Sequence, residues 1–250
     1  MLVPIILKNH STEICLHACT VIRYVSRNIN ARARLENPKV GVLEALVYGA
    51  KGNIAKECCL ATLGNICSNK DIVEHLTSKK LGLVAIAIEN LKNSGDAIIK
   101  LRSARILTNI SNILSSSNCM IMHDHGAVQL ALEIIRDDGG VDPLQWPGGA
   151  HNGYIGGCVT LLQSICRFRS IATEAKALGA RDILAPLILV PPAVSTSLFI
   201  FASFAMAFIS GRDEATNDCD RACTSLLQRY PEIYRSILTV LENTLTGKSG

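Results

Sequence analysis

A short pattern recurs five times along this 250-residue chain, each time at the end of an apolar stretch with helical spacing. In each copy an Ile or Val anchor precedes Ser or Cys. The copies are Tyr24-Val25-Ser26, Asn65-Ile66-Cys67, Asn109-Ile110-Ser111, Ser164-Ile165-Cys166 and Phe208-Ile209-Ser210. The anchors stand 41, 44, 55 and 44 residues apart, and repeats of roughly 40–47 residues are typical of stacked helical units. Chains of that kind usually present surfaces to other proteins and seldom catalyse reactions.

The composition favours helices throughout. Hydrophobic residues make up 48% of the sequence, and Leu, Ile, Ala and Val recur at helical spacing. Aromatic residues make up 4% and only 8 residues are Pro. Few short runs are bounded by turn residues as strands would be. We therefore predict an all-α fold.

The charge is weakly basic and uneven. A net charge of +4 is too small to indicate nucleic-acid binding, which usually requires a clustered basic face. One N-terminal stretch nevertheless gathers basic residues, offset only by Glu36. These residues are Arg23, Arg27, Arg32, Arg34 and Lys39. Such runs are most often solvated helix ends, and a site for an anion or an acidic partner is the alternative.

The ten cysteines lie mostly inside apolar helical segments, where free Cys behaves as a small hydrophobic residue. No secretory signal precedes them, so we expect a reducing, cytoplasmic location. Cys15 with Cys19, and Cys219 with Cys223, have the spacing that puts two thiols on one helix face. Neither pair is accompanied by a second ligand pair at zinc spacing. We predict no metal site and no cofactor.

The helices that we expect follow one order: a short helix, a glycine, a medium helix, a turn and a long helix. Gly82, Gly126 and Gly179 are natural stops before the medium helices, and Asp96 is a suitable N-cap for the long helix that follows it. The long helices are expected at residues 12–25, 53–67, 98–113, 154–168 and 194–210. Short helices are expected at 72–77, 119–124 and 171–177, and medium helices at 40–48, 83–91, 128–135 and 183–190.

Two local segments carry a resemblance to a known family. They are His125-Gly126-Ala127-Val128, before a medium helix, and Leu107-Thr108-Asn109-Ile110, at the end of a long one. With the order of helices, they make the chain resemble armadillo-repeat proteins over nearly its whole length. HEAT repeats have an overlapping period and are the runner-up. The resemblance implies a right-handed α-solenoid of about five armadillo-like repeats, forming a single domain over residues 1–250.

Two segments depart from the regular repeat. Residues 137–153 are rich in Gly and Pro and lengthen one unit by about eleven residues, so we expect an inserted loop. This loop carries Trp146, the one Trp of the chain, as a candidate partner contact; a tolerated surface insertion is the alternative. Residues 213–246 hold two further apolar stretches, which we expect to form a C-terminal helical cap.

In the armadillo proteins that this chain resembles, the long helices line a concave groove. The residues that face this groove lie 1, 5 and 8 positions before each anchor and form one stripe along the helix. The candidates at these offsets in the second, third and fourth units are Asn65, Arg102, Arg105, Asn109, Thr160 and Ser164. Asn65 and Asn109 match the family Asn that binds an extended peptide backbone. Ala61 and Arg105 stand where the family has Trp, so the resemblance to nuclear-import carriers fails at the residues that bind basic signals.

Arg102 and Arg105 indicate a different ligand. Guanidinium groups bind carboxylates in bidentate geometry, so an acidic protein segment is expected in this part of the groove. The alternative is that both arginines are solvated or pair with acids of the chain itself.

Phenylalanines mark the last unit. Four of the five lie between residues 199 and 208, and three of those fall at groove offsets: Phe201, Phe204 and Phe208. An exposed apolar patch there would form an end site for a partner. The alternative is that the C-terminal cap covers it.

Residues 183–210 run for 28 positions without a charge, which is long enough to consider a membrane span. Pro191-Pro192 divides this run where the repeat requires a turn, so we do not expect a transmembrane helix. The sequence also lacks a phosphate-binding loop, a nucleophile elbow and an HExxH motif. We therefore predict a protein without enzymatic activity.

The sequence thus predicts a non-catalytic scaffold or adaptor that binds an extended or helical, acidic partner segment in its groove. Three alternatives stay open. The chain could be an architectural subunit of a larger, cytoskeletal or ciliary assembly that uses its convex face or ends. It could also be a membrane-associated scaffold, or a regulatory subunit of an enzyme, which the sequence does not distinguish from an architectural subunit.

Overall fold

The computed structural model describes residues 12–28, 34–35, 37, 40–52, 55–113, 116–139, 153–188, 197–206 and 208–209. Within these ranges the regular structure is entirely helical. The long helices are α2 (Thr12–Arg27), α5 (Lys56–Ile66), α8 (Ala97–Asn112) and α12 (Tyr154–Ile165), followed by helical residues 197–206 and 208–209. The medium helices are α4 (Val42–Lys51), α7 (Leu83–Asn93), α10 (Ala127–Asp137) and α14 (Ala180–Ile188). The short helices are α6 (Lys70–Thr77), α9 (Ser116–Asp124) and α13 (Arg169–Ala177).

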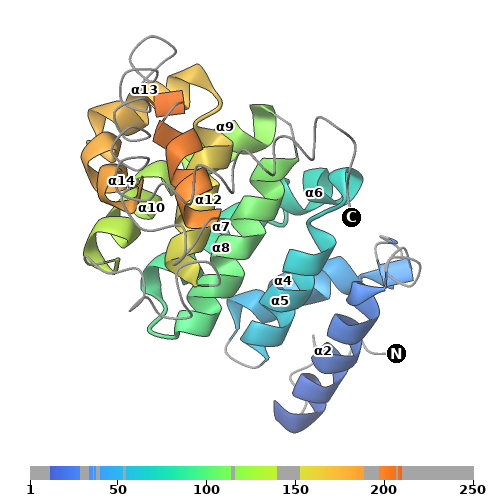
Figure 1. Cartoon of the computed structure of the whole chain (residues 1–250). Coiled ribbons are helices and arrows are strands. Elements are labelled where there is room, and N and C mark those ends of the chain that lie inside the picture. The colour runs from blue at the N-terminus through green and yellow to red at the C-terminus, as the bar shows by residue number, and fades with distance from the viewer. Residues whose placement is uncertain are drawn as a thin grey trace, which may run out of the picture.

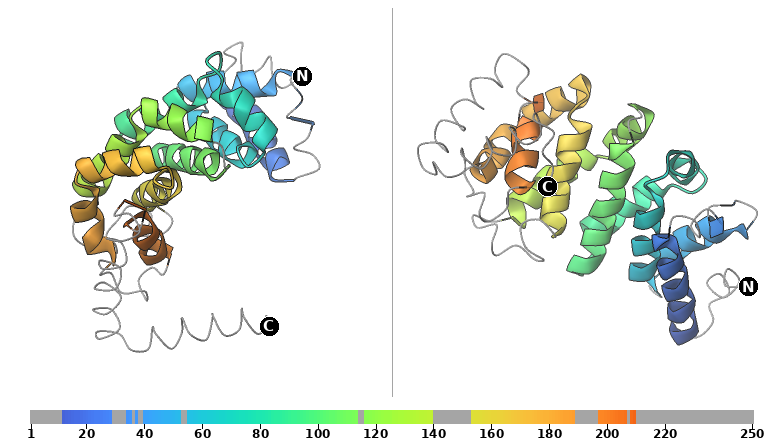
Figure 2. Two further views of the ribbon diagram at one scale, coloured as in Figure 1. Left: turned by 90° about the horizontal axis from the view of Figure 1, so that it is seen from above. Right: turned by 45° about the vertical axis from the view of Figure 1, so that its right-hand side comes forward.

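The helices stack as a right-handed solenoid, as the sequence predicted. Each long helix packs against the next: α2 on α5, α5 on α8 and α8 on α12. The helices α5, α8 and α12 also pack on the medium helices that precede them, α4, α7 and α10. Figure 1 shows this side-by-side order from α2 to α14. Seen from above in Figure 2, the repeats follow a curved path, with the later long helices on its inner side. One repeat has no closed core of its own, so its apolar faces are buried by its neighbours.

The anchors of the recurring pattern explain why the stack holds. Ile66, Ile110 and Ile165 have no exposed surface, and Ile209 is 3% exposed. Burying a side chain of this size stabilises the folded state by about 1.5–3 kcal/mol. Val25, in the first long helix, is only half-buried. The sequence pattern therefore marks the end of each long helix where it enters the shared core.

Glycines set the corner before each medium helix. Gly82, Gly126 and Gly179 have φ of +62°, +75° and +77°, and Gly41 has the same conformation before α4. A side chain at such a φ is strained. The sequence predicted three of these stops, and Gly41 adds a fourth. The predicted N-cap is also present, because the backbone N–H of Ile98 donates to Asp96 Oδ1 at 2.7 Å.

The helices α2 to α14 begin and end within three residues of the predicted positions. Differences of three residues occur at the starts of α5, α9 and α14 and at the ends of α4 and α12. Trp146 and the predicted cap at residues 213–246 lie outside the described residues.

A histidine joins two neighbouring short helices. His123 of α9 bonds through Nε2 to the carboxylate of Glu174 in α13, and its Nδ1 lies 3.2 Å from Asp124 Oδ1. The hydrogen bond with Asp124, and then that with Glu174, raises the pKa of His123 above its ordinary value. We therefore expect the contact between these repeats to depend on pH.

We expect Gly126→Ala to destabilise the protein through the backbone alone. An added Cβ would meet no atom within 4 Å, so the cost is that of holding Ala at positive φ, roughly 1–2 kcal/mol. Urea unfolding measures the change. Gly95→Ala is the matched control, because its Cβ would also enter open space and its φ is not in the left-handed region. Equal stabilities of the two variants would contradict the interpretation.

We expect His123→Gln to weaken the pH dependence of thermal stability. A raised pKa in the folded state means that this contact contributes fully below about pH 6.5, the ordinary value for His. Its contribution is lost as the pH rises through the higher folded value. Between pH 5.5 and 8.5 the wild type should therefore lose more Tm than His123→Gln. The exposed neighbour His125 provides the control variant His125→Gln, and an unchanged pH slope in His123→Gln would refute the assignment.

Candidate partner-binding surface

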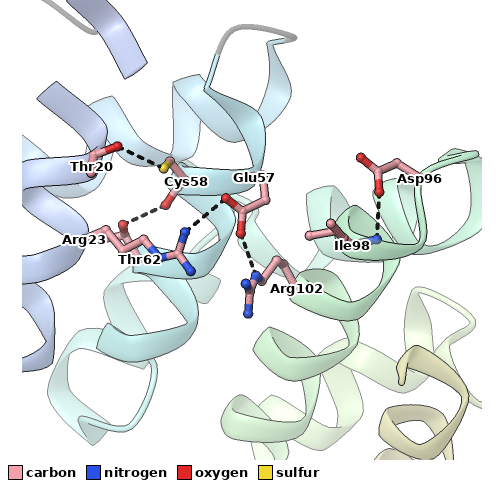
Figure 3. Close-up of polar contacts among 8 residues, drawn as sticks. All are labelled: Thr20, Arg23, Glu57, Cys58, Thr62, Asp96, Ile98 and Arg102. Carbon is pink, nitrogen blue, oxygen red and sulfur yellow. Dashed lines mark hydrogen bonds and ion pairs between the residues drawn. The ribbon is translucent and has the colours of Figure 1, made fainter. Parts of the chain in front are cut away.

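One carboxylate links three successive long helices. Glu57 lies in the first turn of α5, where the helix dipole favours a negative charge. Arg23 of α2 donates through Nη1 to Glu57 Oε2 at 3.1 Å, and Arg102 of α8 donates through Nε to Oε1 at 2.8 Å. Figure 3 shows both arginines reaching this carboxylate from opposite sides. Both oxygens of Glu57 are thereby engaged, and the two arginines are held in place.

A small cavity of about 200 Å³ opens beside this contact. The helix α5 contributes two small residues, Ala61 and Gly64, to its lining. Its lining consists of Arg23, Arg27, Leu60, Ala61, Gly64, Asn65, Arg102 and Arg105. Four guanidinium groups thus surround one cavity, and we call it the arginine pocket.

The described residues do not balance the charge of the arginine pocket. Arg23 and Arg102 share Glu57, whereas Arg27 lies over the ring of Tyr24, 5.2 Å from its centroid. Arg105 is exposed, and among the described residues no acidic side chain forms an ion pair with it or with Arg27. Four positive charges therefore stand against one negative charge, which leaves a formal charge of +3.

Two of these arginines were absent from the predicted groove positions. Neither Arg23 nor Arg27 falls at a family offset from Val25. The sequence places both in an N-terminal basic stretch, with a site for an anion or an acidic partner as the alternative to a solvated helix end. Their spacing, i and i+4, sets both on one face of α2, just as i and i+3 does for Arg102 and Arg105 in α8. What brings the two pairs together is the stacking of both helices against α5, which sequence spacing alone does not reveal.

The predicted polar residues form hydrogen bonds between neighbouring long helices. Asn109 Nδ2 donates to the Gly64 carbonyl at 2.7 Å, and Asn65 Nδ2 donates to Ser26 Oγ at 3.0 Å. Ser164 is fully buried, and its hydroxyl donates to Asn112 Oδ1 at 2.8 Å. These side chains therefore support the stack, and Ser164 has no surface to offer a partner.

Thr160 is half-buried, and its hydroxyl donates to the Gly156 carbonyl of its own helix at 2.9 Å. Its neighbour Gly157 lies at a contact between long helices. A Cβ on Gly157 would come within 2.9 Å of Ala104 Cβ in α8. The helices α8 and α12 therefore approach each other closely at Gly157.

The three predicted phenylalanines differ in exposure. Phe201 and Phe208 are partly buried and pack against the core, whereas Phe204 is 53% exposed. The structure therefore brings Arg102, Arg105, Asn65 and the two further arginines together. Phe204 lies apart from them, at the far end of the described repeats.

Within the described part of the chain, no group of three or more His, Cys, Asp or Glu side chains could hold a metal ion. Among the helices described, none has both the length and the apolar character that crossing a membrane would require.

Designed and engineered proteins are among the solved structures that share this architecture. A designed armadillo repeat protein in complex with the peptide (KR)4 has a TM-score of 0.73 at 15% identity, covering 96% of this chain and 97% of that one. A second designed armadillo repeat protein has a TM-score of 0.68 at 15% identity, covering 88% and 86% of the two chains. An engineered protein has a TM-score of 0.73 at 17% identity, covering 98% and 96%. No protein-family model and no curated protein sequence matches the chain. The fold is therefore that of an armadillo-like repeat solenoid.

We expect Gly157→Ala to destabilise the protein by roughly 1–3 kcal/mol, the usual cost of overpacking. The added methyl group would force α8 and α12 apart at Ala104. Gly64→Ala is the control, because its Cβ would meet Ile106 Cγ1 at an ordinary 3.8 Å. Chemical unfolding of both variants measures the difference, and a Gly157→Ala variant as stable as Gly64→Ala would contradict the close packing.

Proposed function

We propose that this chain is a non-catalytic scaffold that binds an acidic segment of a partner protein along its long helices. The arginine pocket on α2, α5 and α8 is the main contact. The observation that carries this proposal is the excess of four guanidinium groups over one carboxylate around a single cavity. A partner carboxylate would neutralise part of this charge through charge-assisted hydrogen bonds, each contributing about 1.5–3 kcal/mol.

The mechanism is binding to a preformed surface. Arg23 and Arg102 are fixed by Glu57 before any ligand arrives, so the partner segment bears most of the ordering cost. Asn65 borders the pocket and Asn109 lies one repeat further along. The Asn109 side chain also has an amide oxygen that can accept a hydrogen bond from a partner backbone.

Charge distinguishes this surface from that of a structural neighbour. The designed neighbour was solved with the peptide (KR)4, which is made of basic residues. Four arginines around the pocket would repel such a peptide, so we infer the opposite preference here. Phe204, exposed at the far end, extends the proposed surface with an apolar contact, and Trp146 of the inserted segment is a further proposed contact.

We also propose a cytoplasmic location. Eight free cysteines of the described residues are buried, where they serve as small apolar side chains. A reducing compartment keeps such thiols free.

The test is a charge-reversed variant. Arg102→Glu combined with Arg105→Glu should reduce binding of a labelled (Gly-Glu)5 peptide at least about tenfold, because two attractive contacts become repulsive. Fluorescence anisotropy at low ionic strength measures the affinity, with (KR)4 as a peptide that should not bind the wild type.

Lys79→Glu combined with Lys80→Glu is the matched control. Both lysines are exposed in the turn before α7, away from the long helices, and the double change alters net charge by the same amount. If both double variants lose affinity equally, binding depends on net charge alone and the proposed surface is wrong. Unchanged binding by the Arg102→Glu, Arg105→Glu variant would also reject it.

A further inference from the structure

We propose that the arginine pocket accepts a phosphate monoester, that is, a phosphorylated side chain within the bound acidic segment. This inference rests on the proposed function and specifies the chemical group that enters the pocket. It is carried by the size of the cavity, the number of free N–H donors around it and the charge that remains there.

The size of the cavity selects the tip of a side chain. Its volume of about 200 Å³ is below the range of roughly 300–1,000 Å³ typical of small-molecule and cofactor sites. It corresponds to about seven water molecules at some 30 Å³ each. A tetrahedral group on a short linker fits such a space, whereas a nucleotide would extend far outside it.

The donors exceed what one carboxylate can use. Each guanidinium has five N–H groups in a fixed plane. Arg23 and Arg102 each use one of theirs on Glu57. Arg27 lies over the Tyr24 ring, and no acidic side chain of the described residues pairs with its N–H groups. Guanidinium donors from two helices, α2 and α8, therefore surround the cavity. A phosphate monoester has three strong acceptor oxygens, and a carboxylate has two.

The positive charge of the arginine pocket also favours a phosphate monoester. The pocket has a formal charge of +3 after Glu57 is counted. One carboxylate leaves about two of these positive charges unbalanced, whereas a phosphate monoester supplies about −1.5 to −2 near neutral pH. Glu57 does not oppose the ligand strongly, because both of its oxygens are already bound by Arg23 and Arg102.

The experiment uses the full chain and three peptides of one acidic frame, Gly-Glu-Gly-Glu-Gly-X-Gly-Glu-Gly-Glu-Gly, with X as phosphoserine, Glu or Ala. We expect the phosphoserine peptide to bind at least about tenfold more tightly than the Glu peptide. We also expect its affinity to rise about fourfold between pH 5.5 and 7.5, because the second phosphate pKa lies near 6. The Glu peptide should show no such rise, and none of the residues that line the cavity is a histidine.

Substitutions test whether the phosphoserine peptide binds at the arginine pocket. Arg27→Gln combined with Arg105→Gln removes the two arginines that do not bind Glu57. This variant should reduce phosphoserine-peptide affinity to that of the Glu peptide. Lys79→Gln combined with Lys80→Gln should leave it unchanged, and circular dichroism melting verifies the fold of each variant.

The outcomes separate the two proposals. Equal affinities for the phosphoserine and Glu peptides, with no pH dependence, overturn the phosphate inference and leave the acidic-segment proposal standing. Failure of all three peptides to bind overturns both. Tight binding of vesicles that contain a phosphoinositide, without binding of the phosphoserine peptide, also overturns this inference, because the phosphate would then come from a lipid.

Discussion

The whole structure depends on the packing of each long helix against the long helices before and after it. A single repeat cannot bury its apolar side, so Ile66, Ile110 and Ile165 become fully buried only within the stack. Each square ångström of apolar surface removed from water contributes about 25 cal/mol. Stability therefore accumulates from one interface to the next. The close approach at Gly157 shows how little space remains between α8 and α12.

This packing determines which polar groups remain for a ligand. Asn109 and Ser164 use their donors on neighbouring helices and thereby fix the register of the stack. The arginines of α2 and α8 are longer and reach beyond the interface, where one carboxylate on α5 cannot neutralise them all. Asn109 and Ser164 thus use their hydrogen bonds to hold neighbouring helices together. Excess positive charge is concentrated at one place on the surface.

The sequence was sufficient to predict the helices, their order and the glycine corners, because helical periodicity and stop residues are local signals. It also identified Arg102 and Arg105, whose offsets follow from the repeat. It could not predict the arginine pocket. Arg23 and Glu57 are 34 residues apart, and Glu57 and Arg102 are 45 apart, so their meeting depends on the rotation of α2, α5 and α8 in the stack. The burial of Ser164 likewise depends on packing, since its offset alone predicted exposure.

Because Glu57 bridges α2 and α8, the pocket requires at least three consecutive repeats. Its charged groups come from three consecutive units, and none of those units contains the pocket by itself. In a solenoid, the terminal unit can open while the rest of the stack persists. Release of α2 would remove two of the four arginines and leave Arg102 paired with Glu57 alone. Affinity for an anion would then fall before the fold is lost, and a bound anion would in turn hold the first repeat against its neighbours.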